Sequence, residues 1–407
     1  MSSTHTSKNG AIIIATGPHG FAGAGEAMRR WLIELKKSSF EVTLVSKSPP
    51  YRKDDLSSIG IVLENVQSVS SGAIGETGAA GSIDSLSNVG LSQKIIECAR
   101  AANDSGRKII IWAHYLFPFA LAAHTAVKTL RSEGIQCRFW VTPTGSDIWE
   151  VSPLVPDVAN YILGDATDRV IVYSERFARE VLDLTDSCGD KIDIVSPIID
   201  CDRFQPAQGD ERALTRAQFG IPEESFLICH HSNMRPVKRP ERVIAFARDI
   251  ADQVKRAQTH LLMIGPVRPD LQSTNEGLFV HWLGVQDKVE TFLKSSDLAV
   301  NLSAHDSFNL SLGEAMASGV PVVSSDIVGI APIIRKHSGG WVFQFEPDKT
   351  GRADYRLIVD TIARWRVSGS PSIDARSLAA SVKGELGGEC AGRALKHMAQ
   401  KDLNEQR

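Results

Sequence analysis

The chain has 407 residues, of which 43% are hydrophobic and 23% are charged, so it is long enough to form two or three globular domains. Its 45 Lys and Arg residues against 48 Asp and Glu residues give a formal net charge of -3, which argues against nucleic acid or a membrane surface as a partner. The six cysteines are scattered without a C-x-x-C pair, and the polar first nine residues lack a signal-peptide layout, which together indicate a cytoplasmic protein with free thiols.

Short apolar runs alternate with helix-length amphipathic segments, which is typical of parallel sheets covered by helices. The strands predicted in the first half are residues 11–15, 42–45, 108–112, 138–141, 170–173 and 192–195. In the second half they are residues 226–229, 261–264, 278–282, 298–302 and 320–323. We therefore predict an α/β protein with two doubly wound sheets, whose ligands bind outside the carboxyl ends of the strands.

A polar connection over residues 197–222 separates the two halves, and the alternation of strands and helices restarts near residue 225. The glycine-rich residues 68–90 predict a surface loop, and the composition from residue 377 onward predicts a closing helix. The expected domains are residues 1–198 and 199–376, followed by a helical tail over residues 377–407.

Residues 109–127 form a charge-free stretch of nineteen residues, which is long enough to span a bilayer. However, His114, Pro118 and His124 interrupt it, and its first part is typical of a buried strand. We therefore expect no membrane span.

The first predicted strand is followed by a glycine-rich turn that runs into an amphipathic helix. Gly23 and Gly25 would let the backbone approach a ligand, and the helix N-terminus would present N–H groups to an anion. The turn lacks the third glycine of a dinucleotide fingerprint, and residues 45–47 offer no acidic side chain for a ribose, which argues against an NAD site. Alternatively, the glycines serve only tight packing.

Two further turns of the first half carry polar side chains at predicted strand ends. His114 ends a buried strand, where it is placed either for a ligand contact or as an ordinary core histidine. Residues 142–147 supply hydroxyl groups and one carboxylate, which suit a small polar acceptor, although a helix-capping turn would have the same composition.

The second half contains a basic turn and an acidic one. Arg235, Lys238 and Arg239 follow a predicted strand and favour a diphosphate site over a solvated helix start. In residues 303–323 the spacing predicts Asp306 in a turn and Glu314 within a short helix, with backbone amides between them. This layout suits a sugar, a phosphate and a ribose diol, whereas the alternative is a helix whose acidic residues only cap and solvate it.

The acidic segment resembles the E-x7-E region of the family 4 retaining glycosyltransferases, whose usual form is E-x-F-G-L-x-x-L-E-A-M-A-x-G-x-P-V-V. The residues that match are Phe308, Leu310, Glu314, Ala315, Met316, Ala317, Gly319, Pro321, Val322 and Val323. Asp306 replaces the first Glu, Asn309 replaces a Gly and Gly313 replaces a Leu.

Further segments resemble the glycosyltransferases of the bacillithiol and mycothiol pathways within that family. They are residues 231–239 (S-N-F-R-x-V-K-R in those enzymes), 283–289 (L-G-x-Q-D-x-V), 296–298 (S-D-L), 114–118 (H-Y-x-x-P) and 144–147 (H-G-T-D). Thr144 replaces the usual His, and Ser196-Pro197 stands where Tyr-Asn is frequent.

The resemblance implies the GT-B fold, in which two Rossmann-like domains face a central cleft and bind a nucleotide-sugar donor mainly in the second domain and an acceptor in the first. The catalytic residues that it implies are His114, Asp306, Lys238 and Arg235. The implied donor-binding residues are Gly23, Gly25, Asn233, Arg235, Lys238, Ser307, Phe308, Asn309, Leu310 and Glu314. The implied acceptor-binding residues are Tyr115, Thr144, Ser146 and Asp147. No metal or other cofactor is expected, since fixed cations and helix amides stabilise a leaving diphosphate.

The expected function is therefore that of a soluble, retaining glycosyltransferase. The departures at Thr144, Pro197, Asp306 and Asn309 favour an acceptor from an antibiotic pathway, with a thiol or thione conceivable, over the hydroxy acid or cyclitol of a thiol-cofactor pathway. Two other classes stay open, namely a nucleotide-sugar epimerase or hydrolase on the same fold and a non-catalytic sugar-nucleotide-binding protein. The sequence does not identify the nucleotide base, the sugar or the acceptor. It also does not determine whether the chain forms a homo-oligomer.

Overall fold

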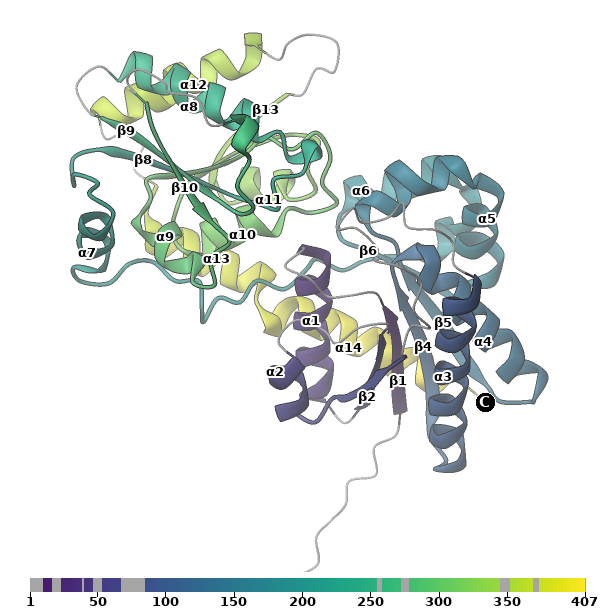
Figure 1. Ribbon diagram of the computed structural model, residues 1–407. Coiled ribbons are helices and arrows are strands. Elements are labelled where there is room, and N and C mark those ends of the chain that lie inside the picture. The colour runs from purple at the N-terminus through teal and green to yellow at the C-terminus, as the bar shows by residue number, and fades with distance from the viewer. Residues whose placement is uncertain are drawn as a thin grey trace, which may run out of the picture. The chain divides into compact units, whose positions relative to one another are not determined.

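The computed structural model describes residues 10–16, 23–38, 40–46, 53–66, 85–254, 258–271, 278–344, 352–368 and 373–406. The chain divides into two compact units, the first over Met1–Ile198 with Gly388–Arg407 and the second over Ile199–Gly387. Each unit contains a parallel sheet with helices packed against it (Figure 1).

The described part of the first unit contains a seven-stranded sheet in the order β3-β2-β1-β4-β5-β6-β7. Its strands are β1 (Gly10–Thr16), β2 (Phe40–Ser46), β3 (Val62–Asn65), β4 (Lys108–His114), β5 (Cys137–Thr142), β6 (Arg169–Val172) and β7 (Ile192–Ile194). The order changes direction between β1 and β4, so the topological switch point lies there.

The helices described in this unit are α1 (Gly23–Lys36), α2 (Lys53–Ser58), α3 (Ser85–Asp104), α4 (Leu121–Ser132), α5 (Pro156–Tyr161), α6 (Glu175–Leu184) and α14 (Gly388–Glu405). Short helical turns cover Leu116–Ala120, Asp147–Val151, Ser152–Leu154, Ile162–Ala166 and Asp186–Lys191. The isoleucines of β1 are buried, as expected for a strand covered on both faces.

Tryptophans from three elements form part of the core of this unit. Trp31 of α1 stacks on Trp112 of β4 with ring centroids 5.5 Å apart, and Trp112 contacts the edge of Trp140 of β5 at 5.6 Å. The buried indole N–H groups are hydrogen-bonded, that of Trp112 to Thr142 Oγ1 at 2.9 Å and that of Trp140 to Asp402 Oδ2 at 2.7 Å. Although these rings are buried, the indole N–H groups of Trp112 and Trp140 therefore keep their hydrogen-bond partners.

The described part of the second unit contains a six-stranded parallel sheet in the order β10-β9-β8-β11-β12-β13. Its strands are β8 (Phe226–His231), β9 (Thr259–Ile264), β10 (Leu278–Gly284), β11 (Leu298–Asn301), β12 (Val322–Ser325) and β13 (Gly340–Phe343). The described helices are α7 (Glu211–Gln218), α8 (Pro240–Gln253), α9 (Val289–Ser295), α10 (Leu310–Ala317), α11 (Ala331–Lys336), α12 (Arg352–Ser368) and α13 (Ala375–Leu386), with short turns over Pro236–Lys238 and Pro269–Leu271. The switch point of this sheet lies between β8 and β11.

The prediction of two doubly wound sheets is confirmed, and each predicted strand is present. Two edge strands of four residues each, β3 and β13, were not predicted. The loop prediction for residues 68–90 is wrong over residues 85–90, which begin α3, while residues 68–84 lie outside the described part of the chain.

The predicted helical tail from residue 377 is divided between the two units. Helix α13 packs against α10 in the second unit, whereas α14 packs against α1 and β4 in the first. Gly388 begins α14 directly against α1, where a Cβ atom would lie 2.5 Å from Glu34 Oε1. The composition identified the helices but not the sheet that each one covers.

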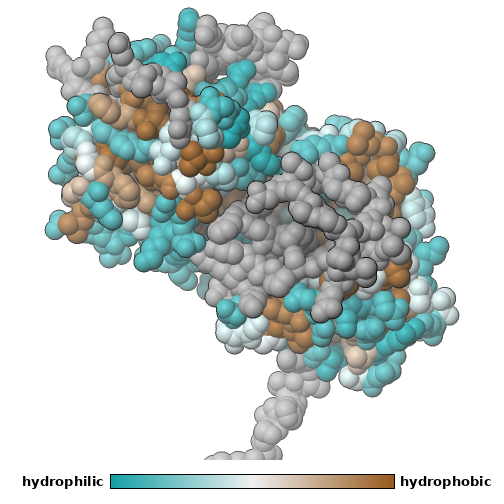
Figure 2. All heavy atoms as spheres, in the orientation of Figure 1, coloured by the Kyte–Doolittle hydropathy of each residue, from teal (hydrophilic) through white to brown (hydrophobic). Residues whose placement is uncertain are grey.

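Residues 109–127, the charge-free stretch, are divided among β4, the turn over Leu116–Ala120 and α4. Among the described residues, no helix has both the length and the apolar character that a membrane crossing requires. On the described part of the face in Figure 2, hydrophobic residues lie in small groups among hydrophilic ones.

Asp402 connects α14 to the first sheet, and removal of its side chain should destabilise the protein. Besides Trp140, it binds Arg169 Nη2 at 2.7 Å, and it is 4% exposed. Asp402→Ala should lower the unfolding free energy by about 3 kcal/mol, because a partly buried cation and an indole donor lose a partner. Urea denaturation followed by tryptophan fluorescence measures this change.

The matched control is Glu405→Ala on the same helix. The Glu405 side chain is 50% exposed and lies 3.4 Å from Arg138, so its loss should cost less than about 0.5 kcal/mol. Equal losses in the two variants would contradict the role of Asp402.

Candidate functional site

The basic turn of the second unit follows β8 at the switch point. Met234 and Arg239 have positive φ angles of 53° and 49°, and the Met234 amide donates to Ser232 Oγ at 3.0 Å. Gly265 at the end of β9 packs against this turn, where a Cβ atom would lie 2.0 Å from the Ser232 carbonyl oxygen. The turn is therefore held by its own backbone and by the neighbouring strand.

His230, the penultimate residue of β8, holds this turn to the neighbouring strand. Its Nδ1 lies 2.8 Å from the Val300 carbonyl oxygen of β11, and its Nε2 lies 2.9 Å from Ser232 Oγ. Burial lowers the pKa of His230 to about 4, so the imidazole is neutral at physiological pH. A neutral ring that donates from Nδ1 to the carbonyl accepts the Ser232 hydroxyl proton at Nε2.

Lys238 and Asp306, both predicted donor-side residues, lie together. Lys238 Nζ is 2.5 Å from Asp306 Oδ2, and the two side chains are only 18% and 12% exposed. Asp306 Oδ1 also accepts the Phe308 amide at 3.3 Å, and the Gly329 amide donates to the Asp306 backbone carbonyl. The structure thus joins the basic turn to the acidic one through a largely buried ion pair.

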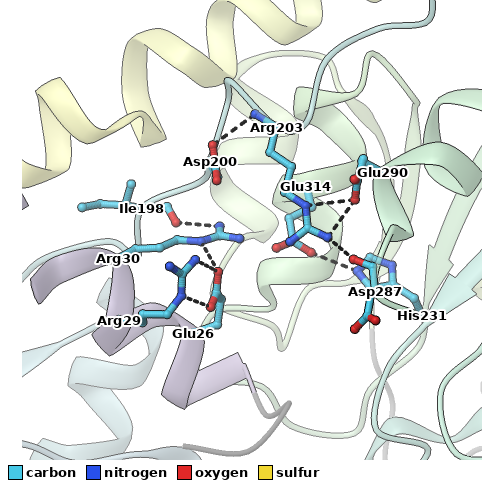
Figure 3. A network of polar contacts seen from close by, with 10 residues as sticks. All are labelled: Glu26, Arg29, Arg30, Ile198, Asp200, Arg203, His231, Asp287, Glu290 and Glu314. Atoms are coloured by element: carbon cyan, nitrogen blue, oxygen red, sulfur yellow. Dashed lines mark hydrogen bonds and ion pairs between the residues drawn. The ribbon is translucent and has the colours of Figure 1, made fainter. Parts of the chain in front are cut away.

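Glu314 is the second acidic residue of the segment and lies within α10. Its Oε2 is 3.0 Å from His231 Nε2, and the two side chains are 11% and 14% exposed (Figure 3). His231 lies within the matched segment, but no role was predicted for it from the sequence. Nothing in the local sequence indicates the contact, because 83 positions separate the two residues.

Two departures from the family pattern have local structural reasons. Asn309 has a φ of 80° where the pattern has Gly, and Asn is among the few residues that adopt this conformation readily. At Gly313, where the pattern has Leu, a Cβ atom would lie 2.7 Å from Ile199 Cδ1. The absence of a side chain at this position therefore makes room for Ile199.

The other predicted donor-side residues differ in accessibility. Arg235 is exposed, and within the described residues its guanidinium makes no ion pair. Asn233 is half-buried, and its Oδ1 accepts the Arg235 amide at 3.4 Å. Phe308 is 2% exposed, so its side chain belongs to the core.

Residues 283–289, another predicted motif, are connected to the start of the second unit. Arg203 donates to the Asp287 carbonyl and binds Glu290 Oε2 at 2.7 Å (Figure 3). The Arg203 amide in turn bonds Asp200 Oδ1 at 3.1 Å. These contacts therefore anchor the first residues of the second unit.

In the first unit, His114 lies at the carboxyl end of β4, as predicted. It is fully buried, its Nε2 is 2.7 Å from the Tyr173 hydroxyl, and its ring contacts that of Tyr115 with centroids 4.8 Å apart. Burial raises the pKa of Tyr173 well above its ordinary value, so the phenol keeps its proton. Tyr115 has a φ of 80°, which turns the chain sharply after the strand.

Asp147 joins the turn after β4 to the turn after β5. Its Oδ2 accepts the amides of Leu116 and Thr144, each at 2.9 Å, and the Thr144 hydroxyl at 3.0 Å. Its Oδ1 accepts the Phe117 amide at 3.4 Å. Of the predicted acceptor-side residues, Asp147 and Thr144 are buried and bonded to each other, while Tyr115 and Ser146 are half-buried.

The glycine-rich turn after β1 is only partly described, because residues 17–22 lie outside the described part of the chain. Gly23 and Gly25 form the start of α1. Burial favours the neutral form of the next residue, Glu26, but Arg29 at 2.6 Å and Arg30 at 2.8 Å outweigh it and lower its pKa to about 2.

This network was not predicted from the sequence, and it also binds Ile198, the residue at which the chain leaves the first unit for the second. Arg30 donates from Nη1 to the Ile198 carbonyl at 2.9 Å (Figure 3). An acidic residue three and four positions before two arginines on one helix is a signal that could have indicated it.

Among the described residues, no three His, Cys, Asp or Glu side chains are arranged to hold a metal ion. The expectation that no metal or cofactor is needed stays a prediction.

Comparison with known proteins places these features in a family context. Residues 211–355 match the family model of glycosyl transferases group 1. The N-acetyl-alpha-D-glucosaminyl L-malate synthase of Bacillus anthracis is 30% identical over 66% of this chain and 69% of its own length. A D-inositol 3-phosphate glycosyltransferase of Salinispora arenicola is 27% identical over 48% of each chain, so the chain spans about half the length of that relative.

Solved structures show the same fold. The crystal structure of a glycosyltransferase from Rickettsia africae has a TM-score of 0.73 at 14% identity, over 98% of this chain and 100% of that chain. Anabaena HepE, solved in complex with UDP and glucose, has a TM-score of 0.69 at 14% identity, over 97% of this chain and 99% of that chain. The predicted GT-B fold of two Rossmann-like units is confirmed by these likenesses.

The buried Asp147 should make stability depend on pH. Burial raises its pKa from an ordinary 3.8 to about 6, although hydrogen bonds from the Leu116, Thr144 and Phe117 amides and the Thr144 hydroxyl oppose the shift. Between pH 4 and 6 the folded state keeps a proton that the unfolded state has released, so stability from this group falls by about 3 kcal/mol as pH rises.

Asp147→Asn should remove this dependence, because an amide does not ionise. Its unfolding free energy relative to the wild type should increase from pH 4 to pH 7 in urea denaturation, and Asp157→Asn, the same substitution at an exposed position, is the control. A difference that stays constant with pH would contradict the raised pKa.

Proposed function

Because the chain belongs to the group 1 glycosyl transferases, we propose that it transfers a sugar from a nucleotide diphosphate to a small polar acceptor with retention of configuration. The observation that supports this most directly is the contact of Lys238 with Asp306 at the switch point of the second sheet. A cation and a carboxylate at the carboxyl edge of a doubly wound sheet suit a diphosphate and a sugar, respectively.

The proposed donor site assigns one role to each group. Lys238 and Arg235 bind the diphosphate together with the first amides of α10, and Glu314 accepts the ribose hydroxyl protons. Lys238 leaves Asp306 for the more highly charged diphosphate, and the Asp306 carboxylate then accepts hydroxyl protons of the sugar. Asn233, Gly23 and Gly25 complete the proposed donor contacts.

In the proposed reaction the bond from the anomeric carbon to the diphosphate oxygen breaks, and the acceptor bonds to the same face of that carbon. The departing phosphate oxygen takes the proton of the acceptor, so no separate base is required. Negative charge accumulates on the diphosphate as the bond breaks, and the fixed cations and helix dipole stabilise it. This reaction retains the anomeric configuration.

On the acceptor side, the proposal uses the two turns that Asp147 holds together. Tyr115, Thr144 and Ser146 supply the polar contacts to the acceptor. His114, at the end of β4, is proposed to face the transferring carbon. In this scheme Asp147 positions the two turns through its amide contacts.

We further propose that the acceptor belongs to an antibiotic or other secondary-metabolite pathway, and that a thiol or thione acceptor would give an S-linked product. The departures from the thiol-cofactor pattern at Thr144 and Pro197, on the acceptor side and at the connection, support this. A second candidate uses UDP-N-acetylglucosamine with L-malate or a cyclitol, and the 30% identity to the Bacillus anthracis enzyme favours it.

Acceptor panels distinguish these candidates. The protein is incubated with nucleotide sugars and either L-malate, a cyclitol, or thiol and thione compounds, and mass spectrometry detects the product. We expect turnover to require an acceptor and NMR coupling constants to show a retained anomeric configuration. Donor consumption without an acceptor would instead indicate an epimerase or hydrolase, and an inverted product would contradict the proposed reaction.

Nucleotide binding tests the donor site directly. UDP, GDP, ADP and TDP are compared by thermal shift, and the preferred diphosphate at a hundred times its Kd should stabilise the protein by about 2.7 kcal/mol. Lys238→Ala should abolish this shift while the unliganded protein remains folded, because the diphosphate loses its buried cation.

Lys336→Ala is the matched control, since that lysine is 63% exposed and pairs with Glu385 in the same unit. Its thermal shift should equal that of the wild type. An unchanged shift in Lys238→Ala would remove Lys238 from the diphosphate site.

A further inference from the structure

The last residue of β8, His231, is bonded to Glu314 of α10, and its imidazole has no role in the proposed reaction. His231 Nε2 lies 3.0 Å from Glu314 Oε2, and Figure 3 shows the two groups facing each other. Their side chains are 14% and 11% exposed, so the pair is shielded from most solvent without being sealed off. It lies at the carboxyl end of β8, next to the switch point of the second sheet.

The chemistry of the two groups determines which one donates the hydrogen bond. A carboxylate offers only acceptor oxygens, so Nε2 of His231 carries the proton. Each carboxylate oxygen has two lone pairs, and accepting one N–H therefore leaves capacity for the two adjacent hydroxyls of a ribose. The contact with His231 is thus compatible with the ribose role proposed for Glu314.

The two side chains differ in how firmly the fold holds them. His231 pairs with Ile264 of β9 in the sheet, so the sheet fixes its backbone. Glu314 reaches the contact through a longer side chain with three torsion angles, whose freedom is lost when the carboxylate is held in one place. A donor carried by a strand can therefore orient a carboxylate carried by a flexible side chain.

The second unit contains a similar pair away from this edge of the sheet. His337 Nε2 is bonded to Glu385 Oε2, and the two side chains are 15% and 28% exposed. His337 lies between α11 and the start of β13, and therefore near the amino end of that strand. Because the strands are parallel, their amino ends lie at the edge opposite His231. No part of the proposed function depends on this second pair.

We propose that His231 is a positioning residue whose Nε2–H holds the Glu314 carboxylate in the orientation that accepts the ribose hydroxyls of the bound nucleotide. This inference rests on the function proposed above, which assigns the ribose to Glu314. A 2′-deoxyribose lacks one of the two hydroxyls, so the oriented carboxylate loses a donor when it is bound. The preference for a ribonucleotide then depends on His231, although its own ring does not contact the ribose.

Three substitutions test this role. His231→Phe keeps an aromatic ring but removes the donor, whereas His231→Gln keeps a side-chain N–H donor. Glu314→Ala removes the carboxylate itself. The matched control is His337→Phe, which makes the same change in the pair at the opposite edge of the sheet.

Calorimetric titrations measure the Kd of the nucleoside diphosphate that the wild type binds and of its 2′-deoxy form. A hydrogen bond to a charged group is worth about tenfold or more in affinity, so the wild type should prefer the ribonucleotide by about that factor. His231→Phe should lose most of this preference by weakening the ribonucleotide, while the Kd of the 2′-deoxy form changes little. His231→Gln should keep the preference, and His337→Phe should bind both nucleotides as the wild type does.

A double variant shows whether His231 acts through Glu314. Glu314→Ala should remove the ribose preference by itself, and the further change His231→Phe should cause no additional loss, because the group that it orients is already absent. Additive losses would mean that His231 contacts the nucleotide directly and would overturn the positioning role.

The remaining outcomes separate this inference from the proposed function. Equal losses for the ribonucleotide and the 2′-deoxy form in His231→Phe, or no loss for either, would overturn the inference and leave the donor site intact. A wild type that binds both forms equally would remove the ribose from Glu314, and one that binds no nucleotide diphosphate would overturn the proposed function itself. If His231→Phe does not fold, His231→Ala also removes the donor and provides the same comparison.

Discussion

The buried imidazole of His230 makes the contacts on which the arrangement of the proposed donor site depends. Its Nδ1 binds β11 just before the acidic turn, and its Nε2 binds Ser232 at the start of the basic turn. Burial keeps the ring neutral, so this pattern of donor and acceptor persists at physiological pH. With both turns fixed at the same edge of the sheet, Lys238 meets Asp306 and His231 meets Glu314.

The two acidic residues therefore do not lie in the protein as isolated buried charges. Asp306 is bonded to Lys238 in the turn after β8 and Glu314 to His231 at the end of β8, which offsets the cost of removing each carboxylate from water. A diphosphate carries more charge than one carboxylate, so it can draw Lys238 away from Asp306. In the proposed function, the contact between Lys238 and Asp306 thus also holds the two side chains where the diphosphate and the sugar would bind.

The periodicity of hydrophobic residues and the positions of the strand ends made much of this arrangement predictable from the sequence. A run of buried apolar residues followed by a polar turn locates the carboxyl edge, and therefore Lys238 and Asp306, from local sequence alone. Side-chain pairing across 83 positions, as between His231 and Glu314, depends on the order of the strands, which local sequence does not contain. The division of the predicted tail between α13 and α14 has the same origin, since helical composition does not specify which sheet a helix covers.

The residues that surround each departure from the family pattern explain how the structure accommodates it. Gly313 removes the volume that the Ile199 side chain occupies, and Asn309 combines the required backbone conformation with a cap for α10. Asp306 is shorter than the usual Glu, yet it reaches both Lys238 and the Phe308 amide. Each altered residue is therefore accommodated by contacts with its neighbours, in a chain that belongs to a glycosyltransferase family.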